Sequence, residues 1–218
     1  MTNSQILRIS GLSLLAGAFI FILHIVLRSI VTAGLAPASF ANESAWVPIN
    51  TLGVIGSILV LLGLPGMYAW MIIPFGLSGL IGVILIAVAW MFIGLFLSFY
   101  SVLILPWLAD RAPALIAVSA PLPVAFVLAF AIGLFAWFGG CLLLSIPFIR
   151  KQAQPTWVGY TLVLSAAWIV IGNLILAPSG PASNLAINLV SNLAPVFLLI
   201  GIANLGYRML SEQSANRK

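Results

Sequence analysis

The chain has 218 residues, of which 63% are hydrophobic and only 5% are charged. A soluble domain carries about 25% charged residues, so this composition excludes a water-facing surface and predicts that the lipid bilayer is the main solvent. The net charge of +5 does not predict nucleic-acid binding, because the basic residues stand singly or in pairs and form no run that follows a phosphate backbone.

Six apolar stretches are long enough to cross a bilayer, which takes about 20 residues in helical form. Backbone groups in lipid must pair within their own segment, and this requirement favours helices at these lengths. The predicted fold is an all-α membrane protein, a single transmembrane domain over residues 1–218 with a bundle of about six helices. In chain order the predicted helices cover residues 9–33, 48–70, 77–105, 123–149, 157–177 and 185–207.

Prolines and basic residues mark the predicted helix ends. Pro48 opens the second helix, where a missing N–H costs nothing, and Pro106 ends the third. The basic pair at 150–151 follows the fourth helix. The turn between the second and third helices is the least defined, because residues 67–75 contain no charge and Pro74 is the one breaker inside them.

The distribution of Lys and Arg predicts the orientation of the bundle. With six spans, both termini and the loops at 71–76 and 150–156 share one side, which holds Arg8, Arg150, Lys151, Arg208, Arg217 and Lys218. The other side holds Arg28 and Arg111. The positive-inside rule then places both termini in the cytoplasm, and we expect the inner (plasma) membrane as the location. Trp46, Trp107 and Trp157 lie near predicted helix ends and fit an aromatic belt.

His24 and Arg28 are the ionisable residues that fall inside a predicted span. Their spacing of four places them on one face of the first helix. Ionisable groups are costly in the bilayer and are functional candidates for that reason. The pair is predicted to bind an anionic or polar ligand, such as a lipid headgroup or a carboxylate. Two structural alternatives stay open: Arg28 extends to the headgroups, or His24 is a neutral imidazole bonded to another helix.

Three asparagines follow one another at four-residue spacing where the sixth predicted helix begins: Asn184, Asn188 and Asn192. Amides that face lipid are costly, so we expect them to face the bundle or a wet cavity. They either bond neighbouring helices together or line a ligand pocket.

The six-helix topology brings these groups to a common depth in the outer leaflet. Tyr100 near the end of the third helix and Asn173 near the end of the fifth join His24 and Arg28 there. The predicted ligand-binding set is therefore His24, Arg28, Tyr100, Asn173, Asn184, Asn188 and Asn192. This hypothesis requires that His24 and Asn188 lie on the same side of the bundle.

The sequence predicts no catalytic residues and no metal site. One histidine and one cysteine, Cys141, cannot supply the three or four protein ligands that zinc needs. No Asp or Glu lies within a predicted span, which disfavours a carboxylate proton relay. A bound lipid is the expected cofactor, and a porphyrin or pigment held by His24 alone is the alternative.

These observations favour a non-enzymatic protein that binds a lipid or small amphiphile, or a subunit of a larger membrane complex. The alternative is a small secondary transporter with a pocket formed by His24, Arg28 and the asparagines. A third interpretation is an intramembrane enzyme that modifies lipid, with His24 as general base. The expected partners are membrane lipids, other membrane proteins or a second copy of the chain.

Overall fold

The structure is a computed structural model that describes residues 3–35, 37–70, 72–116, 123–153, 155–172 and 185–215. Regular secondary structure in these ranges is helical throughout, which confirms the predicted all-α class for them. The α-helices are α1 (Asn3–Thr32), α2 (Trp46–Trp70), α3 (Ile72–Ala89), α4 (Leu97–Phe99), α5 (Leu105–Arg111), α6 (Val124–Ile149), α7 (Trp157–Ile171), α8 (Leu185–Ser191) and α9 (Leu193–Ala215). Short 3₁₀ turns lie at Pro37–Asn42 and Pro113–Ile116, and π-helical turns lie at Trp90–Phe96 and Tyr100–Ile104.

Five helical stretches in the described part of the chain are long and apolar enough to cross a membrane. They are Gln5–Thr32, Trp46–Trp70, Gly76–Arg111, Val124–Ile149 and Leu193–Ser211. The fifth predicted helix corresponds to α7, a shorter apolar helix of 15 residues, and its predicted end at 173–177 lies outside the described residues. The long apolar helices indicate a membrane-embedded protein, and the count of six spans stays a prediction.

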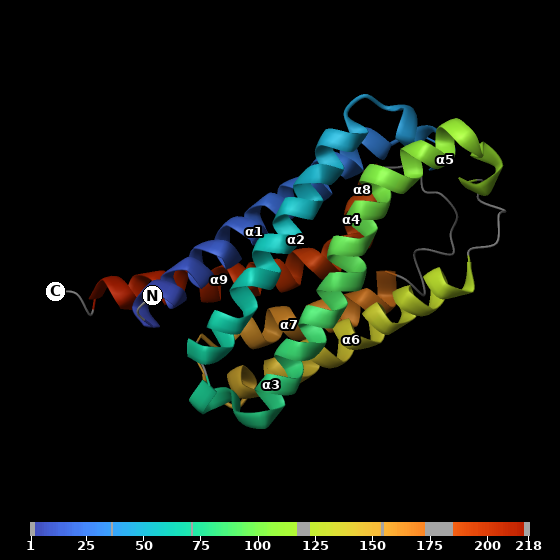
Figure 1. Ribbon diagram of the computed structural model, residues 1–218. Coiled ribbons are helices and arrows are strands. Elements are labelled where there is room, and N and C mark those ends of the chain that lie inside the picture. Colours follow the sequence, from blue (N-terminus) through green and yellow to red (C-terminus); the bar gives the residue numbers. More distant parts are fainter. Residues whose placement is uncertain are drawn as a thin grey trace.

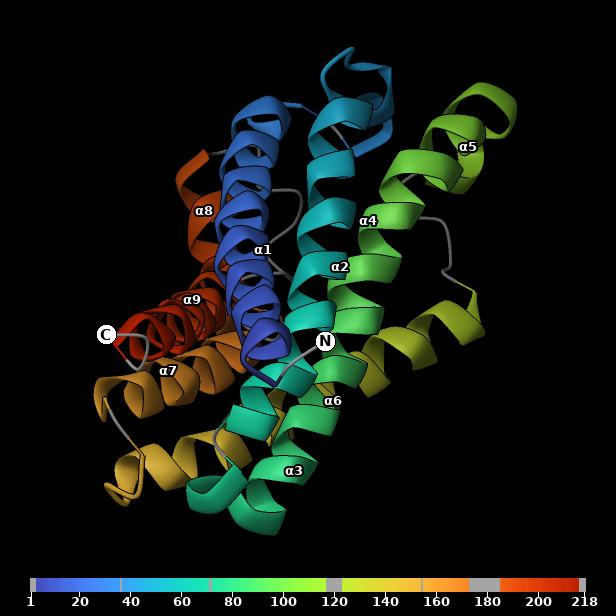
Figure 2. The same ribbon diagram turned by 60° about the vertical axis from the view of Figure 1, so that its left-hand side comes forward.

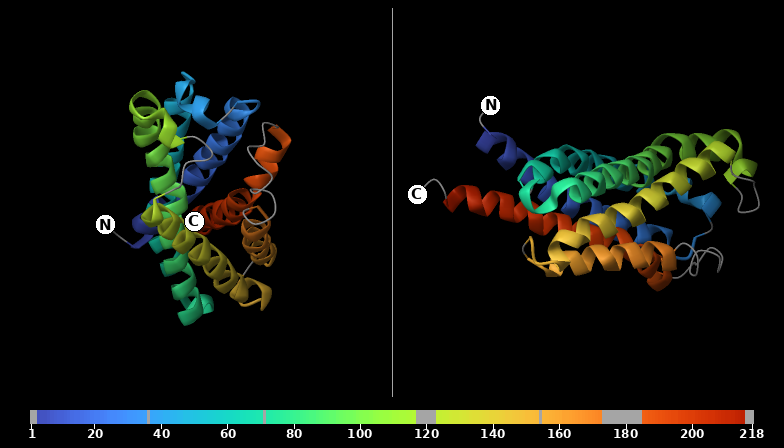
Figure 3. Two further views of the ribbon diagram at one scale, coloured as in Figure 1. Left: turned by 90° about the vertical axis from the view of Figure 1, so that its right-hand side faces the viewer. Right: turned by 90° about the horizontal axis from the view of Figure 1, so that it is seen from below.

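The helices pack in a closed order around the molecule. Helix α1 packs against α2 and α9, α9 against α7, α7 against α6, and α6 against α3, while the π-helical turn Trp90–Phe96 returns to α2. Figures 1 and 3 show α1 beside α2, and the start of α1 and the end of α9 at the same end of the molecule. Large apolar side chains such as Phe19, Leu62 and Phe135 are exposed on the outside, as contact with lipid requires.

Glycines allow α1 and α2 to approach closely. A Cβ atom at Gly17 would lie 2.8 Å from the backbone nitrogen of Val60 and 2.9 Å from the carbonyl oxygen of Gly56. Both atoms belong to the backbone of α2, so only a movement of the helices makes room for a side chain. Small residues at such crossings let helices associate in lipid, where apolar burial alone provides no driving force.

We expect Gly17→Ala to lower the free energy of unfolding by about 1–3 kcal/mol, because overpacking pushes the two helices apart. Denaturation of the purified protein in mixed detergent micelles, followed by circular dichroism, measures this change. Gly139→Ala is the matched control, since its Cβ would meet one side-chain atom, Leu85 Cδ1, at an ordinary 3.4 Å. Equal stability of the two variants would contradict the packing argument.

The third span continues past the position where the sequence predicts its end. Pro106 was expected to stop the helix, but α5 carries the chain to Arg111. Proline lacks an N–H and its ring clashes with the carbonyl four residues before it. The π-helical turn Tyr100–Ile104 widens the coil at that point, and Pro106 then falls in the first turn of α5, where it is tolerated.

The turn between the second and third spans lies between Trp70, inside the predicted window 67–75, and Gly76, one residue beyond it. Helix α2 ends at Trp70, and Gly76 has φ 52° and ψ −151°. A residue with a Cβ rarely adopts this left-handed conformation, so glycine is needed where the chain reverses into the third span.

The sixth predicted helix, 185–207, is divided into two. Helix α8 ends at Ser191, Asn192 forms a turn, and α9 begins at Leu193. Pro195 explains the break, because it cannot donate a backbone hydrogen bond to the preceding turn. Figure 2 shows that α8 and α9 run in different directions, with α8 directed along the upper part of α1. The break places Asn192 and Pro195 beside the interior of the bundle.

Candidate functional site

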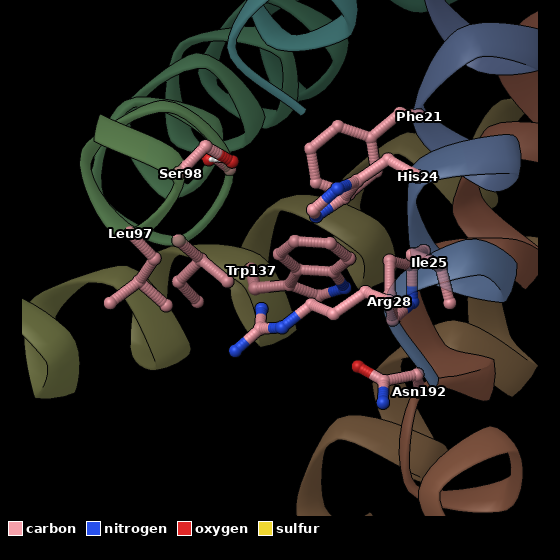
Figure 4. A pocket seen from close by; sticks show the side chains of 11 residues that line it. Phe21, His24, Ile25, Arg28, Leu97, Ser98, Trp137 and Asn192 are labelled. Carbon is pink, nitrogen blue, oxygen red and sulfur yellow. Dashed lines mark hydrogen bonds between the residues drawn. The ribbon is translucent and has the colours of Figure 1, made fainter. Parts of the chain in front are cut away.

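A pocket of about 100 Å³ lies between α1, the π-helical turn with α4, α6 and the start of α9. Its polar lining comes from His24, Arg28, Ser98 and Asn192, and its apolar lining includes Phe21 and Trp137. Figure 4 shows His24 and Arg28 extending from α1 toward the same space, with Trp137 between them, Asn192 below Arg28, and Leu97 and Ser98 on the opposite side. Residues far apart in the sequence therefore form one site.

His24 is almost completely buried, with an exposed fraction of 2%. Its Nδ1 atom lies 2.9 Å from the backbone carbonyl oxygen of Ile49 in α2. A carbonyl oxygen can only accept, so Nδ1 carries the proton and donates this bond. In the neutral ring Nε2 then has a free lone pair, and within the described residues nothing donates to it. His24 thus bonds to a second helix through one nitrogen and offers the other as an acceptor.

Gly53 makes this arrangement possible. A Cβ atom at position 53 would lie 2.6 Å from Ser98 Oγ and 3.0 Å from His24 Nε2. The absence of a side chain lets α2 approach α1 and α4 closely enough to hold both polar atoms beside each other. A porphyrin ring is larger than the pocket of about 100 Å³ that His24 lines, so the pocket does not fit that group.

Arg28 contributes its guanidinium to the pocket wall and lies over an aromatic ring. Its Cζ atom is 5.5 Å from the centroid of Trp46, which is a cation–π distance. The Trp46 indole is held by a 2.8 Å hydrogen bond from Nε1 to the carbonyl oxygen of Ser101. Trp46 was expected in an aromatic belt at the membrane surface, but its exposed fraction is 1%. It is a buried support for Arg28.

No carboxylate in the described part of the chain neutralises Arg28. The ion pair that the described residues form joins Arg111 to Asp110 at 3.0 Å, and both of these side chains are exposed. Glu43 is exposed in the loop before α2. An uncompensated guanidinium inside a membrane protein is unusual, because charge burial in lipid costs several kcal/mol.

The asparagines connect the start of α9 and α8 to α1. The Nδ2 atom of Asn192 donates to the carbonyl oxygen of Asn188 at 2.7 Å. The Nδ2 atom of Asn188 lies 3.4 Å from Thr32 Oγ1, and that hydroxyl donates to the carbonyl oxygen of Arg28 at 2.9 Å. His24 and Asn188 therefore lie on the same side of the bundle. Asn192 lines the pocket, whereas Asn188 holds α8 against α1.

Of the other candidate residues, only Tyr100 and Asn188 belong to the described part of the chain. Tyr100 packs edge-on against Phe126 of α6 with ring centroids 5.4 Å apart, and it does not line the pocket. Asn173 and Asn184 lie outside the described residues. The pocket therefore brings together three of the seven predicted site residues, His24, Arg28 and Asn192.

Ser98 and Trp137 also line the pocket. Ser98 was expected at the depth of the site but was left out of the predicted ligand-binding set, and Trp137 was not predicted. Ser98 Oγ donates to the carbonyl oxygen of Gly94 at 2.7 Å. Trp137 Nε1 donates to Ser165 Oγ at 2.9 Å, and Ser165 donates to the carbonyl oxygen of Ala194 at 2.7 Å. Ser98 lies between two π-helical turns, and such turns are often found at functional sites. No local sequence pattern predicts π-helical turns, so this signal is visible only in the structure.

The wall behind the pocket contains buried polar atoms without a protein partner in the described residues. They are Asn50 Oδ1, Ser57 Oγ and Trp90 Nε1. A Cβ atom at Gly94 would lie 3.0 Å from Ser57 Oγ and 3.1 Å from Trp90 Nε1, so these two atoms are close neighbours. Buried polar groups of this kind are usually satisfied by internal water, so we expect ordered water beside Gly94.

The site offers one cation and several hydrogen-bond acceptors. Ser98 directs its proton to Gly94 and not to His24, so it is not prepared as a nucleophile. Among the described residues, no three His, Cys, Asp or Glu side chains gather to hold a metal ion. The arrangement is suited to binding.

Comparisons of the chain with protein-family models, curated proteins and solved structures find no match. The fold and the pocket therefore define its class: a helical membrane protein with an internal polar pocket. What it binds has to be argued from the chemistry of that pocket.

Proposed function

We propose that this protein is a non-enzymatic, polytopic membrane protein that binds the anionic headgroup of a lipid or small amphiphile. The observation that carries the proposal is the guanidinium of Arg28, which lies in the pocket without a carboxylate partner among the described residues. A charge held within the bilayer without a partner is costly. An oxyanion in the pocket would offset that cost.

The size of the pocket supports a headgroup as the occupant. Its volume of about 100 Å³ is smaller than an engineered cavity of about 150 Å³ that binds benzene. A phosphate or carboxylate with a few attached atoms fits such a space, whereas an acyl chain does not. In this proposal the headgroup enters the pocket and the acyl chains remain in the surrounding lipid.

The proposal includes the orientation predicted from the basic residues. Arg8, Arg150, Lys151 and Arg208 lie toward the end of the bundle where α1 begins and α9 ends, and Arg28 lies near the other end of α1. With six spans and cytoplasmic termini in the inner membrane, the pocket opens in the outer leaflet. The bound lipid would come from that leaflet.

The test is lipid retention by an Arg28→Gln variant. We expect the wild-type protein, purified in mild detergent, to retain anionic lipid in native mass spectrometry. The variant should bind about 10- to 100-fold more weakly, because hydrogen bonds to a charged group contribute about 1.5–3 kcal/mol. Arg111→Gln is the matched control, since Arg111 is exposed and lies outside the pocket. Unchanged anionic-lipid affinity in Arg28→Gln would overturn the proposal.

A transporter is the second candidate, and the broken helices around the pocket favour it. The π-helical turn at Trp90–Phe96 and the break at Asn192 both contribute lining residues. Discontinuous helices commonly form substrate sites in secondary transporters. Alternating access would require an opening through Leu14, Val60 and Leu64, which are buried between the pocket and the other end of the bundle.

Cysteine accessibility distinguishes the two functions. In a Cys141→Ala background, a cysteine is introduced at Asn192. If the protein is a binding protein, this cysteine should react with a membrane-impermeant thiol reagent added to one side of the membrane and not with reagent added to the other. A transporter would show reaction from both sides, with the ratio of the two rates changed by the ligand. Proteoliposomes with the reagent added inside or outside measure this.

A further inference from the structure

Three acceptor atoms face the pocket together with Arg28. His24 Nε2 has a free lone pair because Nδ1 donates to Ile49. Ser98 Oγ uses its proton in the bond to the carbonyl oxygen of Gly94, so it presents only lone pairs to the pocket. Asn192 uses Nδ2 in the bond to the carbonyl oxygen of Asn188, which leaves Oδ1 as an acceptor. Figure 4 shows this amide oxygen on the side of Arg28 and the nitrogen directed away.

Two of these acceptors are immediate neighbours. A Cβ atom at Gly53 would lie 2.6 Å from Ser98 Oγ and 3.0 Å from His24 Nε2, so both atoms come together beside α2. Neither atom receives a hydrogen bond from the described residues. Protonation of His24 would place a second cation beside Arg28 in the bilayer, which is costly. Two neighbouring acceptors without a donor therefore call for a donor on the ligand.

We infer that the ligand carries a hydroxyl group beside its anionic oxygen: the oxyanion binds Arg28, and the hydroxyl shares its one proton between His24 Nε2 and Ser98 Oγ in a three-centre hydrogen bond. This inference rests on the proposed function and adds the chemical class, a hydroxylated oxyanion such as a glycerol phosphate group. An ammonium group would also donate, but it would add a positive charge to the small space that Arg28 already occupies. A hydroxyl is a neutral donor and meets no such repulsion.

The experiment compares four lipids that share their acyl chains and differ in charge and in donor. Phosphatidylglycerol is anionic with hydroxyls, and phosphatidylmethanol is anionic without one. Phosphatidylethanolamine is zwitterionic with a donor, and phosphatidylcholine is zwitterionic without one. Each is titrated against the full-length protein in detergent and its affinity is measured by native mass spectrometry. We expect phosphatidylglycerol to bind about tenfold more tightly than phosphatidylmethanol, and both zwitterionic lipids to bind more weakly than either.

Variants assign the preference to the named atoms. Ser98→Ala and His24→Phe should each reduce the preference for phosphatidylglycerol over phosphatidylmethanol to about twofold or less. Binding of phosphatidylmethanol, whose headgroup has no hydroxyl, is measured in each variant as the reference for this ratio. Ser145→Ala is the matched control, because Ser145 is a buried serine that bonds the carbonyl oxygen of Leu142 outside the pocket. If His24→Phe does not fold, Ser98→Ala alone decides the question.

A soluble competitor identifies the source of the hydroxylated oxyanion. Glycerol 3-phosphate that displaces phosphatidylglycerol at equal concentration would assign the site to a soluble anion of this class. Failure of glycerol 3-phosphate to compete would assign it to the lipid headgroup.

The possible failures are distinguishable. Equal affinity for both anionic lipids, with both dependent on Arg28, would overturn the hydroxyl inference and leave the proposed function standing. A phosphatidylglycerol preference that survives Ser98→Ala would also overturn it. Anionic lipids that bind no better than phosphatidylcholine, or that bind Arg28→Gln as well as wild type, would overturn the proposed function and the inference with it.

Discussion

Trp137→Ala should lower the free energy of unfolding more than any other single substitution considered for this chain. Trp137 is 1% exposed, lies on the wall of the pocket and packs against Trp90 with ring centroids 5.4 Å apart. Its Nε1 bonds Ser165 of α7, and Ser165 bonds the carbonyl oxygen of Ala194 in α9. One side chain thus joins α6, α7 and α9.

We expect a loss of about 3 kcal/mol, the lower end of the range for Trp→Ala in protein cores. The lower end applies because transfer from water contributes less in lipid, where packing and interhelical hydrogen bonds dominate. Unfolding by denaturing detergent in mixed micelles, monitored by circular dichroism, gives the measurement. Trp137→Phe keeps most of the ring packing and should lose only about 1 kcal/mol, the contribution of the Nε1 hydrogen bond.

Trp107→Ala serves as the control for this prediction. Trp107 lies in α5 with an exposed fraction of 60% and should tolerate the change. If Trp137→Ala and Trp107→Ala prove equally stable, the contacts of Trp137 with three helices do not contribute to the free energy of unfolding.

Gly53→Ala should damage stability and the pocket together. The added methyl group would lie 2.6 Å from Ser98 Oγ and 3.0 Å from His24 Nε2, so α2 or both side chains must move. Overpacking of this kind costs about 1–3 kcal/mol. Because the displaced atoms line the pocket, anionic-lipid affinity should fall along with thermal stability, whereas Gly17→Ala at a crossing away from the pocket should affect stability alone.

A second substitution tests the cause. Ser98→Ala removes the hydroxyl that meets the new methyl group, so the double variant Gly53→Ala/Ser98→Ala should recover about 1 kcal/mol relative to the sum of the single changes. Additive losses in this double-mutant cycle would refute a steric origin at Ser98. Unfolding of the four proteins under the same detergent conditions provides all the required values.

The sequence by itself determined the class of fold and the approximate positions of most helices. Hydropathy and length are properties of a single segment, and the bilayer imposes the same length on each spanning helix. The ends of the second and fourth predicted helices therefore agree with α2 and α6 within a few residues. The spacing of His24 and Arg28 was sufficient to place both on one face of α1, because helical periodicity is also local.

Irregular helices were beyond sequence reasoning. Pro106 was taken as a helix end, yet the π-helical turn before it let the third span continue to Arg111. The sixth predicted helix was drawn through Asn192, where the structure has a break. A proline or a polar residue permits either outcome, and packing against neighbouring helices decides between them.

Only the tertiary structure decided which polar residues share a site. Trp46 and Tyr100 both lie near helix ends, but Trp46 is buried under Arg28 and Tyr100 packs on α6 away from the pocket. Ser98 is one of many serines in the sequence, and it became a pocket residue because Gly53 lets α2 approach it. The charge of Arg28 follows directly from the sequence. That no described carboxylate pairs with Arg28, and that three acceptors lie beside it, could be seen only in the structure. Those features depend on contacts between helices that are distant along the chain, and such contacts form only when the helices pack together.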